Sequence, residues 1–150
     1  MKSCSKKESE VKTGLIVSND GCGRGLLAYV ILRKRLPDVK FKLAGLVVPA
    51  GQALDPYAVS ALRKQGLSAG AVRSVQVSDE LLRKADFVVA LSVENENYLR
   101  NTYEAFSAEK TMNLNIPTVI ERSESAYEKT FGGINEAVSR LLSCSCRCGC

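Results

Sequence analysis

The amino-acid sequence predicts a single α/β domain of three layers, in which helices cover both faces of a four-stranded parallel sheet. Two observations support this fold class. Short apolar runs, which suit buried strands, alternate along the chain with longer segments that carry helix caps or helical periodicity. The composition is that of an ordinary globular domain, with 45% apolar and 25% charged residues in a chain of 150. No apolar run approaches the about 20 residues that would cross a bilayer.

The first three elements set the pattern. Residues 13–17 form a short apolar run that suits a buried strand, and the glycine-rich segment 18–25 follows it as a loop. Residues 26–36 are predicted to be a helix, because cations occupy the last turn and Pro37 stops it. A strand, a glycine-rich loop and a helix in this order are typical of the start of an α/β fold.

The rest of the chain repeats the alternation of strands and helices. Further strands are predicted at residues 41–48, 86–91 and 112–115. Two helices are expected after the N-cap residues Asp55, which Pro56 follows, and Ser78. Two longer helices are predicted at residues 94–106 and 126–142. Because strands joined by helical crossovers run parallel, the order implies one parallel sheet.

The predicted domain occupies residues 13–142, between a polar arm (1–12) and a cysteine-rich tail (143–150). The arm lacks the apolar stretch of a secretory signal. Cys4 and Cys22 are isolated, whereas the other four cysteines lie in the tail. A disulfide scaffold would spread its cysteines through the fold, so we expect a cytoplasmic protein.

The charged residues exclude several classes of function. The net charge of +5, from 21 basic and 16 acidic residues, is spread over the chain. No stripe of Lys and Arg is interleaved with aromatic residues, so no nucleic-acid partner is expected. The chain contains no His, which is the commonest general base and zinc ligand. Ser-His-Asp and Cys-His mechanisms are therefore excluded.

Several segments share their order and spacing with a known family. They are residues 54–67 (LDPYAVSALRKQGL), 72–77 (VRSVQV), 82–91 (LRKADFVVAL) and 126–131 (AYEKTF), together with Ala44-Gly45-Leu46 and Ile116-Pro117. In these segments the chain resembles the low-molecular-weight protein tyrosine phosphatase family, which includes arsenate reductases of the same fold. The resemblance covers residues 13–142 and implies that fold.

The resemblance also implies a phosphate-binding loop after the first strand. In the family a Cys is followed by five residues and an Arg, and the Cys thiolate attacks phosphorus. The loop amides and the Arg hold the equatorial oxygens, and an Asp before a Pro protonates the leaving group. Arg24 matches the family's Arg, but Ser18 occupies the attacking position and Thr118 the acid position. Gly25 replaces the Ser that helps to lower the pKa of the Cys.

These departures predict a pseudophosphatase with a binding or regulatory role. A serine hydroxyl cannot be ionised as a thiol can, and a threonine cannot donate a proton as a carboxylic acid does. The expected anion-binding residues are Arg24, Gly21, Gly23 and Gly25. Their ligand would be phosphate, another oxyanion or a phosphoprotein, and an unidentified protein partner is also expected. Asp20 would oppose a bound dianion unless its side chain turned outward.

Other interpretations of the same loop stay open. The protein could be an active phosphatase or an arsenate reductase with an atypical loop. Cys22 could be the nucleophile in place of Ser18, although the family's spacing argues against this. Arg24 could be a surface or capping residue that binds no anion.

The four tail cysteines, Cys144, Cys146, Cys148 and Cys150, are candidate ligands of a soft metal such as zinc, Cu(I) or an iron–sulfur cluster. This suggests a metal-handling protein as a further alternative, whereas the domain itself needs no cofactor. Cys148-Gly-Cys150 also resembles the double prenylation signal of Rab-type GTPases, and a membrane partner is expected only if these cysteines are lipidated. A redox role and a disordered tail are the remaining interpretations.

Overall fold

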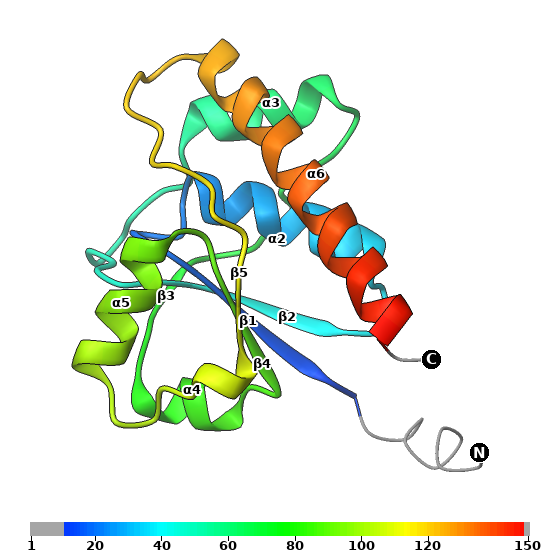
Figure 1. The fold of residues 1–150 in the computed structure, drawn as a ribbon. Coiled ribbons are helices and arrows are strands. Elements are labelled where there is room, and N and C mark those ends of the chain that lie inside the picture. Colours follow the sequence, from blue (N-terminus) through cyan, green and yellow to red (C-terminus); the bar gives the residue numbers. More distant parts are fainter. Residues whose placement is uncertain (1–10, 149–150) are drawn as a thin grey trace.

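The structure, a computed structural model, describes the backbone of residues 11–148 and the side chains of residues 11–143 (Figure 1). The strands are β1 (Thr13–Ser18), β2 (Lys40–Gly45), β3 (Val75–Gln76), β4 (Phe87–Ala90) and β5 (Thr111–Asn113). The helices are α2 (Arg24–Arg35), α3 (Pro56–Lys64), α4 (Asp79–Lys84), α5 (Val93–Thr102) and α6 (Glu124–Cys148), with a short 3₁₀ turn, η1 (Ala108–Lys110). The predicted α/β fold class is confirmed.

The sheet is parallel throughout and has the strand order β3-β2-β1-β4-β5. The central strand β1 pairs with β2 on one side and β4 on the other, so that Ile16 lies between Leu43 and Val89. All five strands end at the same edge of the sheet, which we call the carboxyl edge; the opposite edge is the amino edge.

Two layers of helices cover the sheet (Figure 1). Helices α2, α3 and α6 contact one another on one face, where Ile16 contributes to the core. On the other face, Leu82 of α4 and Leu99 of α5 join the core with Leu15 and Val17. Alternate residues of β1 thus point to opposite faces of the sheet, as the two-residue period of a strand requires. Packing on both faces holds the end of β1 in place.

The number of strands was predicted wrongly. The structure has five strands, because the two-residue strand β3 pairs with the end of β2 at Ala44–Gly45. Both residues of β3 are exposed at the rim of the sheet, so no apolar run indicated a strand there.

Helix boundaries also differ from the prediction. Helix α2 begins earlier, at Arg24, so that part of the predicted loop belongs to its first turn. The helical backbone of α6 continues through Cys148, whereas the prediction ended this helix at residue 142 and began a separate tail. Within residues 11–148, no helix is both long and apolar enough to cross a membrane.

Candidate functional site

The loop 18–25 lies at the carboxyl edge, where open α/β sheets commonly hold ligands. Backbone hydrogen bonds join it to neighbouring segments: Leu46 N donates to Ser18 O over 3.0 Å, and Asp55 N donates to Cys22 O over 3.0 Å. Gly23 is the N-cap residue of α2, and its carbonyl oxygen accepts a hydrogen bond from Leu27 N. The structure therefore brings the predicted residues together where β1 passes into α2: Ser18 ends the strand, Gly21 and Gly23 lie in the turn, and Arg24 and Gly25 open the helix.

Two amides of the loop are bound by side chains of the loop itself. Gly21 N donates to Ser18 Oγ over 3.0 Å, and Cys22 N donates to Asp20 Oδ1 over 2.9 Å. Such short local hydrogen bonds are typical of Asx and Ser turns. In a phosphate-binding loop, amides like these would donate to the oxyanion. Here two of those donors already have an acceptor.

Close packing around the loop requires two of its glycines. Gly21 has φ +78°, and Ser74 occupies the space that a Cβ there would need. A Cβ on Gly25 would lie 2.5 Å from Ser18 Oγ. A serine at residue 25, as the resemblance would have it, fits only if the Ser18 hydroxyl leaves its present position.

Arg24 is buried, with 6% of its surface exposed, and its guanidinium binds neutral groups. Nη1 donates to the carbonyl oxygen of Ile116 over 2.7 Å, and Nη2 donates to Asn95 Oδ1 over 3.5 Å. Among the described residues, no carboxylate lies within ion-pair distance of it. Burial lowers the pKa of Arg24, and the negative charge of Glu94 is the largest opposing influence. Arg24 thus joins α2 to the segments after β4 and β5.

Asn95, which the sequence analysis missed, connects Arg24 to the loop. It is 1% exposed, and its Nδ2 donates to Asn19 Oδ1 over 2.7 Å. Ser92 caps the helix by accepting a hydrogen bond from Asn95 N, which fixes the first turn of α5. A buried Asn in a polar helix leaves no periodic signal that distinguishes it from its exposed neighbours.

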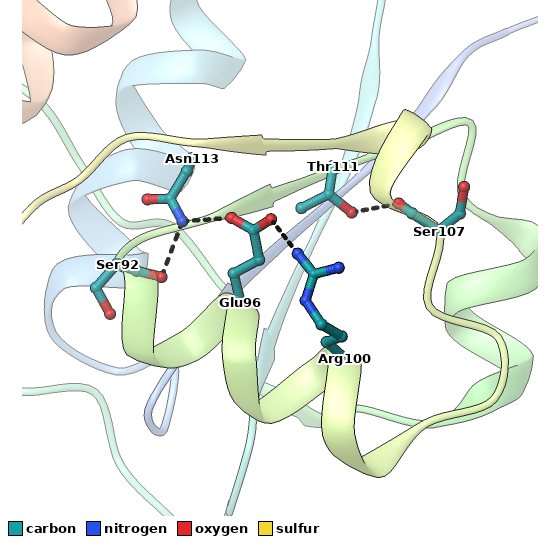
Figure 2. Close-up of polar contacts among 6 residues, drawn as sticks. All are labelled: Ser92, Glu96, Arg100, Ser107, Thr111 and Asn113. Carbon is teal, nitrogen blue, oxygen red and sulfur yellow. Dashed lines mark hydrogen bonds and ion pairs between the residues drawn. The ribbon is translucent and has the colours of Figure 1, made fainter.

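A contact between α5 and β5 holds this network in place (Figure 2). Asn113 Nδ2 donates to Ser92 O over 3.0 Å and to Glu96 Oε1 over 2.7 Å, and Arg100 pairs with the other oxygen of Glu96. Thr111 Oγ1 donates to Ser107 O at the start of the same strand. These hydrogen bonds position the helix that carries Asn95.

Asp55 forms a second polar cluster on the other side of the loop. It is 9% exposed and caps α3 by accepting a hydrogen bond from Tyr57 N, as predicted. Its Oδ2 also accepts from the Tyr127 hydroxyl over 3.0 Å and pairs with Arg122 Nη1 over 2.9 Å. Burial, followed by the hydrogen bond to Asp55, raises the pKa of Tyr127 to about 12. The loop after β5 is thereby tied to the start of α3.

Cys22 and Thr118 lie in different environments. Cys22 is buried, and this burial, reinforced by the charge of Asp20, raises the pKa of its thiol. A protonated, buried thiol is a weak nucleophile. Thr118 lies in an exposed stretch after β5. Both residues therefore differ from the thiolate and the carboxylic acid that the resemblance implies.

The predicted metal ligands fall outside the described side chains. The structure describes side chains for residues 11–143, and this range does not include Cys144, Cys146, Cys148 and Cys150. Within the described part of the chain, no three His, Cys, Asp or Glu residues gather so that they could hold a metal ion.

Comparison with known proteins identifies the family. The family model described as "Low molecular weight phosphotyrosine protein phosphatase" matches residues 15–146. The chain belongs to this family. A probable low molecular weight protein-tyrosine-phosphatase, EpsP from Ralstonia nicotianae, is 26% identical over 95 residues, which cover 63% of this chain and 66% of the relative.

Solved structures of the family share the fold. The tyrosine phosphatase Wzb from Escherichia coli K30, in complex with sulphate, has a TM-score of 0.79 at 21% identity, with 87% of this chain and 96% of that chain covered. A mutant of the YwlE arginine phosphatase with a phosphorylated active-site serine has a TM-score of 0.76 at 20% identity, covering 86% of this chain and 92% of that chain. The identities are low, so these likenesses concern the fold.

Proposed function

We propose that this member of the low molecular weight phosphotyrosine protein phosphatase family is catalytically impaired and acts by binding, as a regulatory pseudophosphatase. The observation that carries the proposal is the state of the loop 18–25. Ser18 stands at the attacking position, and its Oγ and the Asp20 carboxylate accept hydrogen bonds from two loop amides.

The chemistry of the loop supports impairment at each step of the family's reaction. Ser18 has an ordinary hydroxyl, and no His exists in the chain to remove its proton. Thr118 cannot act as the general acid, and loss of that role alone costs about 10²–10⁴ in rate. Arg24, which would stabilise the transferred phosphoryl group, instead donates to Ile116 O and Asn95 Oδ1.

A binding role is compatible with the same geometry. The loop retains the family's Arg and its place at a helix N-terminus, next to the end of β1. A phosphoprotein or a free oxyanion could bind if Arg24 and Asp20 exchanged their present partners for the ligand. The sulphate complex of Wzb makes sulphate and phosphate suitable probes, and the phosphorylated serine of the YwlE mutant shows which covalent product to look for.

The test is hydrolysis of p-nitrophenyl phosphate by the full chain, beside Arg24→Ala and the matched surface control Arg33→Ala. We expect no turnover above that of Arg24→Ala. The triple variant Ser18→Cys, Asp20→Gly, Thr118→Asp should gain activity, and Ser18→Cys, Thr118→Asp should gain far less because Asp20 still holds the Cys22 amide.

Two outcomes would contradict the proposal. Robust hydrolysis by the unmodified chain that disappears in Arg24→Ala would identify an active phosphatase with an atypical loop. Rapid arsenate reduction that depends on Cys22 and the tail cysteines would identify a reductase. The intact mass of the protein, measured after incubation with p-nitrophenyl phosphate, shows whether Ser18 retains a phosphoryl group.

The proposed metal-handling role of the tail has a separate test. A four-thiolate site would require residues 144–148 to leave the helical backbone that α6 has there. Zinc titration of the full chain, compared with a chain that ends at Leu142, should show extra uptake only in the full chain. Equal uptake by both would remove the metal-handling alternative.

A further inference from the structure

Exposed cations gather at the amino edge of the sheet, opposite the loop 18–25. The chain returns to this edge at the end of α2 and α4 and starts β1 and β2 from it, and α6 ends there (Figure 1). We call the exposed basic residues of these segments the amino-edge face: Lys12, Arg33, Lys34, Arg35, Lys40, Lys42, Arg83, Lys84 and Arg140. The exposed carboxylates near this edge are fewer: Asp38, Glu80, Asp86, Glu109 and Glu136. Two of them pair with cations of the face, Glu80 with Lys84 and Glu136 with Arg140.

Lysines surround an apolar hollow within this face. A cavity of about 240 Å³ is lined by Lys40, Lys42 and Lys84, with Leu15 and Leu81 among its apolar residues. Among the described residues, Lys40 and Lys42 have no carboxylate within ion-pair distance. Their long alkyl chains can lie along the apolar surface while the ammonium groups stay in water. The hollow therefore combines positive charge at its rim with apolar walls.

A second apolar cavity is lined by residues near both ends of the part of the chain whose side chains are described. This cavity of about 430 Å³ is lined by Lys12, before β1, and by Leu141 and Leu142, near the end of α6. Leu36 and Phe87 also line it. Residues 1–10 and 144–150 therefore join the domain at the amino-edge face.

Positive and negative groups are more evenly balanced around the loop 18–25. Asp20 lies in the loop, Asp55 beside it is paired with Arg122, and Glu94 is near enough to Arg24 to influence its pKa. An anionic surface would therefore attract the amino-edge face and leave the loop turned away from it.

We propose that the amino-edge face binds the surface of an anionic phospholipid bilayer, with the loop 18–25 left open to solution. Clustered Lys and Arg residues are attracted to anionic headgroups, and the apolar hollow between the lysines suits the boundary between headgroups and acyl chains. A single-stranded nucleic acid would favour exposed aromatic rings for stacking, but the exposed tyrosines, Tyr57 and Tyr98, lie on α3 and α5. This inference does not depend on the impairment of catalysis.

The test is co-sedimentation of the full, unlipidated chain with vesicles of phosphatidylcholine, with and without phosphatidylserine. We expect binding only with phosphatidylserine, and weaker binding as salt rises because salt screens the charges. Replacing Lys40→Gln and Lys42→Gln should lower the partition coefficient about 25-fold, since each lysine near the surface contributes about five-fold. The variant Lys34→Gln, Lys84→Gln should behave in the same way.

A charge-matched control separates this face from the net charge of the molecule. Arg73→Gln, Lys129→Gln removes the same charge from exposed positions outside the amino-edge face and should change binding by about two-fold or less. Thermal melts of each variant should match the unmodified chain, because all the replaced residues are exposed. Equal losses in all three variants, or no preference for phosphatidylserine at low salt, would overturn the proposal. Displacement from the vesicles by RNA at an equal phosphate concentration would also overturn it, in favour of a nucleic-acid surface.

Discussion

Two buried charges lie at the loop 18–25, Arg24 within it and Asp55 beside it, and the protein compensates them in different ways. Arg24 is surrounded by the carbonyl oxygen of Ile116 and the amide oxygen of Asn95, with no carboxylate in contact among the described residues. Asp55 has a full set of partners: the hydroxyl of Tyr127, the guanidinium of Arg122 and a backbone amide.

The difference separates a charge that opposite charge and hydrogen bonds compensate from a charge that only neutral groups contact. Moving a cation from water into the protein interior costs free energy. A carboxylate partner offsets more of that cost than neutral dipoles do. Arg24 is thus a residue whose removal should cost the fold comparatively little. Asp55 is one whose removal leaves several groups without a partner.

The largest expected effect on stability follows from Asp55→Ala. The change removes the N-cap of α3 and leaves the buried Tyr127 hydroxyl without its acceptor. Together these losses should lower the free energy of unfolding by about 2–4 kcal/mol. Urea denaturation followed by circular dichroism measures the change. Asp38→Ala, at an exposed position, is the control and should stay within about 0.5 kcal/mol of the unmodified chain.

Arg24→Met should have a smaller effect, about 1–2 kcal/mol. The methionine fills much of the same volume and removes the cost of burying a charge, but Ile116 O loses its hydrogen-bond donor. The same denaturation experiment, with Arg63→Met as an exposed control, measures the difference. A loss larger than that of Asp55→Ala would show that Arg24, and not Asp55, holds the edge of the site together.

Tyr127→Phe should cost about 1–2 kcal/mol at neutral pH, because the hydrogen bond to Asp55 is lost. It should also change the response to alkali. The unfolded chain releases the tyrosine proton near pH 10, whereas the folded chain holds it to about 12. The resulting stability is present below pH 10 and disappears as the pH rises from 10 to 12. Thermal melts across this range should fall less steeply in the variant; equal slopes would mean that Tyr127 is not buried against Asp55.

The same two clusters mark how far the sequence could predict the site. The sequence correctly predicted that Ser18 and Arg24 stand at the two ends of one short strand-to-helix connection, because a strand, a glycine-rich turn and a helix follow one another there. The cap at Asp55 was predicted for the same local reason, and Tyr57 N confirms it.

The partners of these residues could not be predicted, because they come from distant parts of the chain. Tyr127 is 72 positions from Asp55, and Ile116 is 92 positions from Arg24. In the second case the acceptor is a backbone carbonyl, which has no signature in the sequence. The edge strand β3 was missed for a related reason, since two exposed residues form no apolar pattern. Local chemistry fixes helices and caps, whereas pairing at the site depends on how the elements pack.

The smallest expected effect on stability is that of Asp20, and its replacement separates two reasons why the loop would reject an anion. Asp20 is half-buried, and its carboxylate both carries a charge and accepts the hydrogen bond of Cys22 N. Asp20→Asn removes the charge but keeps an oxygen that can accept this bond, whereas Asp20→Ala removes both. Each change should alter the free energy of unfolding by about 1 kcal/mol or less.

Affinity for sulphate and phosphate, measured by calorimetry, should distinguish the two variants. If the occupied amide is the main obstacle, Asp20→Ala should bind the anion measurably while Asp20→Asn stays close to the unmodified chain, because an anion can then accept from Cys22 N in place of the carboxylate. If charge repulsion dominates, both variants should gain affinity to a similar extent. We expect the first result, since the hydrogen bond at 2.9 Å already satisfies the amide. Failure of both variants to bind either anion would show that Arg24, held by Ile116 and Asn95, keeps the loop closed whatever residue stands at position 20.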